Sequence, residues 1–156
     1  HKTMRGFLYV ISGHALRNGD INEPFDGHFP AGEAMTDQLV SPEELPLWLT
    51  EEDLHFYVDE ITRTGFRGGL NWYRNINRLP AITAPFLGST INQPSFYMGG
   101  STDLIAGNTP EAISSMQQAL GDLRHCEIIE GAGHWLQQEC SSEVSSAMVN
   151  FLEGLD

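Results

Sequence analysis

Residues 94–103 read PSFYMGGSTD, a short apolar run that is closed by two glycines and followed by an acid. Such a run, bounded by turn residues, is typical of a buried strand in a parallel sheet. A second run, CEIIEGAGH at residues 126–134, has the same form and ends in a histidine. Between the two runs, Thr109 and Pro110 form a helix cap followed by a proline at the first helical position. We therefore predict a strand–helix–strand unit of an α/β fold.

Helical patterns precede this unit in the chain. Thr50 stands before three acids, which is typical of a capped helix N-terminus, and an apolar stripe then runs to Gly65, a residue suited to a helix C-terminus. A second short helix is expected to end at Pro80. Residues 1–50 are rich in Gly, Pro, Asn and Asp, so they predict mostly loop, above all over residues 18–30.

The elements fall into two consecutive segments. We expect a helical cap over residues 1–86 and the C-terminal part of an α/β core over residues 87–156. Two parallel strands do not form a stable sheet by themselves, and the first would present an unpaired edge. The sequence therefore predicts an incomplete sheet, which a missing N-terminal half or a second copy of the chain would complete.

The composition is acidic and argues against two kinds of partner. The chain has 8 Lys and Arg against 21 Asp and Glu, for a net charge of −13. Nucleic acids and anionic membrane surfaces both require clustered basic residues. No stretch is long and apolar enough to span a bilayer, and the apolar run at residues 7–11 is too short for a signal peptide. Because position 1 is not Met, we expect the chain to begin inside a longer polypeptide.

The two cysteines predict a reducing environment. Cys126 lies in the second apolar run, and Cys140 lies just before the last predicted helix. A disulfide framework in so short a chain would normally use more cysteines. We therefore expect two free, mostly buried thiols and a cytoplasmic location.

Asp103 and His134 carry the chemistry that the sequence suggests. Each follows the end of a predicted strand, and functional groups of open α/β sheets gather beyond these carboxyl ends. The two residues are 31 positions apart, one strand–helix–strand unit, so their loops are expected to meet. A carboxylate beside an imidazole fixes the ring tautomer and stabilises the imidazolium. Alone, the acid could be a helix cap and the histidine a surface residue, but the order acid then histidine favours a catalytic pair.

No nucleophile accompanies this pair. The sequence contains neither a Gly-x-Ser-x-Gly nor a Gly-x-Asp-x-Gly turn. The six histidines show no ligand spacing such as His-x-x-x-His on a helix, so we expect no metal and no other cofactor. The chain by itself is therefore expected to lack turnover.

Three stretches resemble the soluble-type epoxide hydrolases of the α/β-hydrolase superfamily. TGFRGGLNWYRN at residues 64–75, with FYV at residues 56–58, is similar to the cap region of that family. GGSTD at residues 99–103 is similar to its acid loop, and GAGHWLQQE at residues 131–139 is similar to its histidine loop. The resemblance implies that the chain is the C-terminal half of such an enzyme, with a small epoxide as substrate and a vicinal diol as product.

The resemblance also implies roles for five side chains. His134 would activate the water that hydrolyses a covalent aspartyl ester, and Asp103 would orient His134. Tyr73 would donate a proton to the epoxide oxygen as the ring opens, although an aromatic on an amphipathic helix also packs in cores. Trp135 and Phe66 would contact the substrate, with core packing an equal alternative for Trp135.

Two other interpretations remain open. An open sheet edge also fits a non-catalytic binding or assembly module that pairs with a second copy or another protein. The same fold also serves haloalkane dehalogenases and esterases. Tyr73 argues against a dehalogenase, because a halide needs no proton, and the upstream nucleophile would decide between Asp and Ser chemistry.

Overall fold

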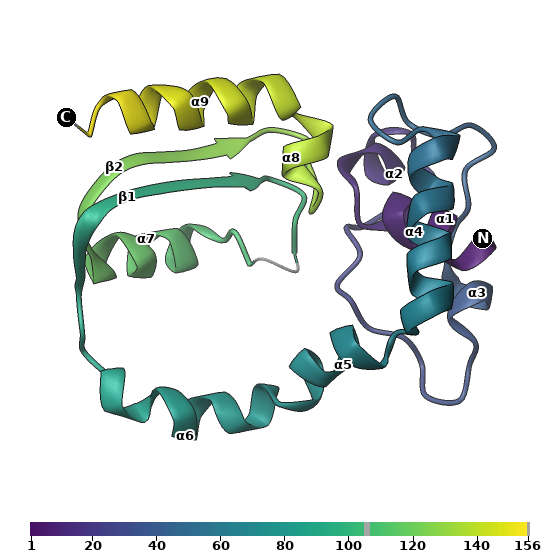
Figure 1. Cartoon of the computed structure of the whole chain (residues 1–156), viewed down its shortest axis with the longest axis horizontal. Coiled ribbons are helices and arrows are strands. Elements are labelled where there is room, and N and C mark those ends of the chain that lie inside the picture. The colour runs from purple at the N-terminus through teal and green to yellow at the C-terminus, as the bar shows by residue number, and fades with distance from the viewer. Residues whose placement is uncertain (105–106, 156) are drawn as a thin grey trace.

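A computed structural model describes residues 1–104 and 107–155 of the chain. It places a helical N-terminal part beside a two-stranded sheet, with a row of short helices linking them (Figure 1). The elements, in chain order, are α1 (Lys2–Val10), α2 (Gly13–Arg17), α3 (Met35–Gln38), α4 (Glu51–Thr64), α5 (Arg67–Arg74), η1 (Ile76–Arg78), α6 (Leu79–Thr83), η2 (Ala84–Phe86), β1 (Ile91–Gly100), α7 (Pro110–Ala119), β2 (Leu120–Ile129), α8 (Leu136–Glu139) and α9 (Ser141–Glu153).

The strand–helix–strand prediction is confirmed. β1 and β2 pair in parallel, with Tyr97 opposite Cys126 and Gly100 opposite Ile129, and α7 connects them. Helices α7 and α9 lie on opposite sides of the two strands (Figure 1). Both strands are longer than the apolar runs predicted, because polar residues at their N-terminal ends also join the ladder. The ladder brings the carboxyl ends of both strands to one edge.

The predicted ends of the helix between Thr50 and Gly65 are confirmed in α4, whereas the prediction that a helix ends at Pro80 is wrong. Thr50 and Asp53 form a reciprocal capping box at the start of α4, and Gly65 ends the helix with a φ of 67°. Pro80, expected to end a helix, instead lies in the first turn of α6, where its missing N–H would have had no helical partner.

The expectation of mostly loop before residue 50 is wrong at its beginning. Helix α1 buries Met4 and Leu8 against Leu49 and Leu54, so the first helix and α4 share one core cluster. A Cβ at Gly6 would come 2.9 Å from Leu39 Cβ, so this glycine allows the close approach of the following chain. The glycine lowered the local helix signal, and tertiary packing outweighed it. Residues 18–30 contain neither helix nor strand, as predicted.

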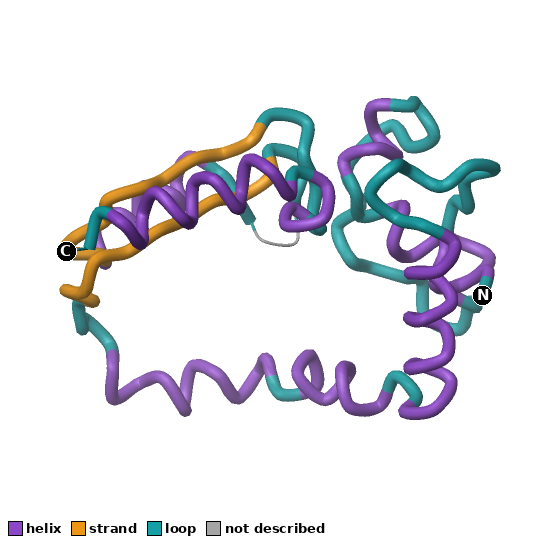
Figure 2. The backbone as a smooth tube through the Cα atoms, turned by 45° about the horizontal axis from the view of Figure 1, so that its top comes forward, coloured by secondary structure: helices purple, strands orange, loops and turns teal. Residues whose placement is uncertain are grey.

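The sheet is incomplete, as predicted. Within the described ranges it consists of β1 and β2 alone. Every residue from 62 to 94 is exposed, which includes α5, η1, α6 and η2. Figure 2 shows this row of helices running as an extended arm from α4 to the start of β1. The division at residues 86 and 87 falls just after η2 and stays a prediction.

Two further sequence expectations concern burial and membranes. Both cysteines are free, but Cys126 is exposed rather than buried, because the side of β2 on which it lies is not fully covered; Cys140 is half-buried. Across residues 1–104 and 107–155, no helix has the length and apolar character that a bilayer crossing requires.

Candidate active site

The loops after β1 and β2 are bonded to each other. Ser101 N–H donates to Ile129 O at 3.0 Å, and Thr102 donates to Ala132 O through its N–H at 3.0 Å and through its hydroxyl at 2.8 Å. A Cβ at Gly100 would come within 2.3 Å of Ala132 O, so only glycine permits this approach. Backbone contacts therefore fix the two loops that carry the predicted acid and histidine.

Asp103 and His134 meet at this edge of the sheet. His134 Nδ1 lies 3.2 Å from Asp103 Oδ1 and 3.1 Å from Oδ2. Because a carboxylate only accepts, the ring donates its Nδ1–H, which leaves the Nε2 lone pair available to take a proton. The Asp103 side chain is 8% exposed and the His134 side chain is 33% exposed. A buried acid thus holds an imidazole that solvent or substrate can reach, as base catalysis requires.

Helix α1 and the residue that follows it, Ile11, contact the histidine and its neighbour Trp135. His134 N–H donates to Ile11 O at 3.0 Å, and the Trp135 indole N–H donates to Leu8 O at 2.8 Å. The Trp135 ring also packs against Phe7 and His134, with ring centroids 6.3 Å and 5.1 Å apart. These contacts fit the core-packing alternative for Trp135, while its contact with a substrate stays a prediction.

The structure does not bring Tyr73 and Phe66 to this pair. Tyr73 lies on α5 with 65% of its surface exposed, and its phenol has no hydrogen-bond partner among the described residues. Phe66 precedes α5 and is 42% exposed. In this arrangement of the chain, no contact between the described residues holds the phenol beside His134. The predicted roles of both residues stay predictions.

A small hollow lies beside the acid. Its wall includes Asp103, Thr102 and Leu104 from the acid loop, and Ser12 and Phe25 from the N-terminal part. Sequence reasoning did not associate residues 10–25 with the site, because turn-rich segments carry no periodic signal that relates them to a distant loop.

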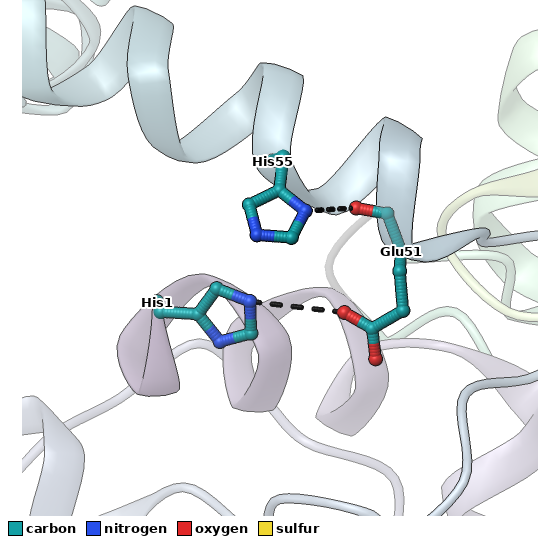
Figure 3. Close-up of side chains that lie close together, drawn as sticks. All are labelled: His1, Glu51 and His55. Atoms are coloured by element: carbon teal, nitrogen blue, oxygen red, sulfur yellow. Dashed lines mark hydrogen bonds and ion pairs between the residues drawn. The ribbon is translucent and has the colours of Figure 1, made fainter.

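His1, Glu51 and His55 form a separate cluster that joins α1 to α4 (Figure 3). Their possible ligand atoms all lie within 4.8 Å of one another, and all three residues are exposed. His55 Nδ1–H donates to the Glu51 carbonyl at 2.7 Å, while Arg5 Nη1 donates to Glu51 Oε1 at 2.8 Å. This candidate ligand set, which sequence spacing did not reveal, thus has a carboxylate that Arg5 already neutralises.

Glu139 is a further residue that sequence reasoning passed over. Its side chain is 1% exposed and accepts backbone N–H groups from Gly13, Gly133 and Trp135. Burial raises the pKa of Glu139 above the ordinary 4.5, and those N–H groups and Arg17 offset part of the rise. The only signal in the sequence was an acid five positions after the histidine, which is as common on a solvated helix face.

Known proteins with similar sequences share one activity in their names. Epoxide hydrolase A of Mycobacterium tuberculosis is 42% identical over 127 residues, which are 81% of this chain and 39% of that protein. A protein of Caballeronia sordidicola named epoxide hydrolase is 34% identical over 154 residues, 99% of this chain and 45% of that protein. The chain is similar to the C-terminal half of epoxide hydrolases. No protein-family model matches it.

Solved structures of epoxide hydrolases share the fold of this chain. An epoxide hydrolase from an endophytic Streptomyces aligns with a TM-score of 0.85 at 35% identity, and epoxide hydrolase A from Mycobacterium thermoresistibile with 0.80 at 37% identity. Each alignment covers 99% of this chain and 46% of the epoxide hydrolase. The chain thus spans about half the length of the epoxide hydrolases it matches, and that half is the C-terminal one. The family resemblance and the α/β-hydrolase fold are confirmed.

Proposed function

We propose that this chain supplies the acid and the histidine of an epoxide hydrolase that converts a small epoxide to a vicinal diol through a covalent aspartyl ester. One observation carries the proposal. His134 Nδ1 lies 3.1 Å from an Asp103 carboxylate oxygen at the carboxyl ends of two adjacent parallel strands. The nucleophilic aspartate would come from the N-terminal half of the relatives, which this chain does not cover.

His134 would serve in the second half of the reaction. With its Nδ1–H donated to Asp103, the ring presents Nε2 to a water molecule. Nε2 takes a proton from that water while the oxygen attacks the ester carbonyl. The imidazolium then gives its proton to the oxygen that leaves as the acyl C–O bond breaks, so the diol departs and the carboxyl group re-forms and ionises. Asp103 lowers the energy of the imidazolium that results, because a buried negative charge lies beside it.

Tyr73 would serve in the first half. As the carboxylate attacks an epoxide carbon, the carbon–oxygen bond breaks and the developing alkoxide requires a proton or a hydrogen bond. A phenol on α5 can supply it only where α5 faces the histidine, and here the arm is exposed. The proposal therefore includes a partner for the arm and for the open sheet, either the uncovered half of the protein or a second copy of the chain.

We also propose how the chain divides into two segments and where in the cell the enzyme acts. Residues 1–86 would form the cap of the enzyme and residues 87–156 the C-terminal part of its core. Two free cysteines are in keeping with the reducing environment of the cytoplasm, which is where we place the enzyme. Phe66 and Trp135 would contact the substrate on the cap side and the histidine side respectively.

The test joins this chain to the N-terminal half of Mycobacterium tuberculosis epoxide hydrolase A and measures diol formation from styrene oxide. We expect turnover by the joined protein and none by the chain alone. In the joined protein, His134→Gln should stop ester hydrolysis, so mass spectrometry should detect protein that is heavier by one epoxide. If a folded joined protein turned over epoxide equally fast with and without the His134→Gln substitution, the proposal would be rejected.

A further inference from the structure

Glu139, the last residue of α8, is a buried carboxylate that the mechanism above does not use. With 1% of its side chain exposed, it has lost its water, and a buried charge is stable only when donors replace that water. Its Oε2 accepts N–H from Gly13 at 2.9 Å and from Gly133 at 3.2 Å, and its Oε1 accepts N–H from Trp135 at 3.2 Å.

Two of these donors flank His134 in the sequence. Because the N–H groups of residues 133 and 135 bind the same carboxylate, the backbone on both sides of the histidine is held. The third donor, Gly13, begins α2 and lies 126 positions away in the chain. The N–H of His134 itself donates to Ile11 O at 3.0 Å, so the histidine and the carboxylate bind the same turn, residues 11–13.

The contact between this turn and the histidine loop leaves no room for adjustment. A Cβ at Gly133 would come 2.3 Å from Gly13 N, and a Cβ at Gly13 would come 1.9 Å from Gly131 O. Both glycines are therefore required by close backbone contact rather than by a special backbone angle. Arg17, from the same N-terminal part, also donates to Gly131 O. One carboxylate thus lies where two backbone segments, residues 11–13 and the histidine loop, meet.

We propose that Glu139 is the positioning residue of His134: its carboxylate fastens the histidine loop to residues 11–13 and so sets the direction of the imidazole toward Asp103. The catalytic consequence rests on the proposed function, but the geometric claim does not. The charge near Glu139 comes from Arg17, and the neighbouring His14 Nδ1, 3.9 Å from Oε2, accepts N–H from Arg17 and Trp48. The carboxylate therefore acts on the acid–histidine pair through the backbone that it binds.

The first test uses NMR on the whole 156-residue chain and its variants. Glu139→Gln keeps the size of the side chain and one acceptor oxygen but puts an NH₂ donor against backbone N–H groups, while Glu139→Ala removes both acceptors. Glu143→Gln is the matched control, because Glu143 is an exposed acid in the first turn of α9. If Glu139→Ala does not fold, Glu139→Gln still gives the result.

We expect amide exchange at Gly133 and Trp135 to be about 10- to 100-fold faster in Glu139→Gln, since a hydrogen bond to a charged acceptor is lost. Imidazole ¹⁵N signals should also show that His134 is no longer held as the Nδ1–H tautomer. The control should match the native chain in both measurements. A lower melting temperature with an unchanged His134 tautomer would reduce Glu139 to a structural residue and overturn the proposal.

The second test separates this inference from the proposed function. In the joined protein, Glu139→Gln should lower kcat by about 10²-fold, the effect of a small misplacement of a catalytic group, with KM changed less than about twofold. Loss of the tautomer without any epoxide turnover in the native joined protein would leave the positioning role intact and reject the hydrolase. Epoxide turnover that is the same in the native joined protein and in Glu139→Gln would support the hydrolase and reject the positioning role.

Discussion

Two parts of the chain, which are similar in size, differ in how their residues are held in place. The acid–histidine corner (residues 99–103 and 129–139) is bonded loop to loop, buries Asp103 and Glu139, and packs against α1. The arm (residues 67–86) consists of short helices in which every residue is exposed. The corner holds Asp103 and His134 in contact within this chain, whereas the arm carries Tyr73 on a helix that buries no residue against the rest of the described chain. One part of a proposed site can therefore be held in place by local loop contacts while another part still lacks contacts within the described chain.

The largest expected effect on kcat comes from replacing Asp103, the acid of the corner. Asp103→Asn replaces an acceptor by a group that can donate to the ring, so His134 would adopt the wrong tautomer. In the joined protein kcat should fall by about 10⁴-fold, as for the equivalent change in other acid–histidine pairs. Steady-state kinetics with styrene oxide measure it. A loss of less than about tenfold would mean that His134 does not depend on Asp103.

A pair of identical substitutions compares the packing of the two regions. Leu136 is 6% exposed and packs with Ala132 and Val144, while Leu79 in the arm is 46% exposed. Leu136→Ala should therefore reduce the free energy of unfolding by about 2–5 kcal/mol, and Leu79→Ala by no more than about 0.5 kcal/mol. Urea unfolding of the 156-residue chain gives both values. Similar losses would show that the arm is packed as tightly as the corner.

The effect of substituting Tyr73 should depend on whether the N-terminal half is joined to the chain. In the chain alone, Tyr73→Phe should change the free energy of unfolding by less than about 0.5 kcal/mol, since the residue is exposed. In the joined protein the same substitution should slow ring opening by about 10²-fold and alter substrate binding much less. Single-turnover kinetics resolve the two steps. A change confined to KM would reject the role of proton donor.

The smallest expected effect is a pH dependence that belongs to the corner. Burial raises the pKa of Glu139, so the folded chain binds a proton more tightly than the unfolded chain does. This contribution to stability is complete below the unfolded pKa, near 4.5, and is lost as pH rises through the higher folded pKa. Urea unfolding of the native chain over this range should show the decline.

The variant Glu139→Gln separates the titration of Glu139 from the titration of the other acids. Glu139→Gln cannot titrate, so its free energy of unfolding should lack this part of the decline. His14 also lies near Glu139, and burial together with Arg17 lowers its pKa below 6.5, so its titration must be separated from that of Glu139. The variant His14→Asn serves as the control. If the free energies of unfolding of the native chain and of Glu139→Gln changed with pH in parallel, the decline would not come from Glu139.

Much of the fold and the pair at its edge could be predicted from the sequence. The two apolar runs that end in glycine loops, the capping box of Thr50 and the proline after Thr109 each depend on residues close together in the chain, and such local preferences survive folding. The ladder of a parallel pair then brings the two loops to one edge, so Asp103 and His134 had to be neighbours.

Tertiary structure alone decided what surrounds that pair. Helix α1 contains a glycine and lies in a segment rich in turn residues, and it folds because it packs against α4. Glu139 and Gly13 are 126 positions apart, so no local pattern could relate a buried carboxylate to a turn at the start of the chain. The position of Tyr73 was not determined at either level, because α5 buries no residue against the rest of the described chain. Periodicity specifies which face of an element is apolar, while contacts over long sequence separations decide what that face meets.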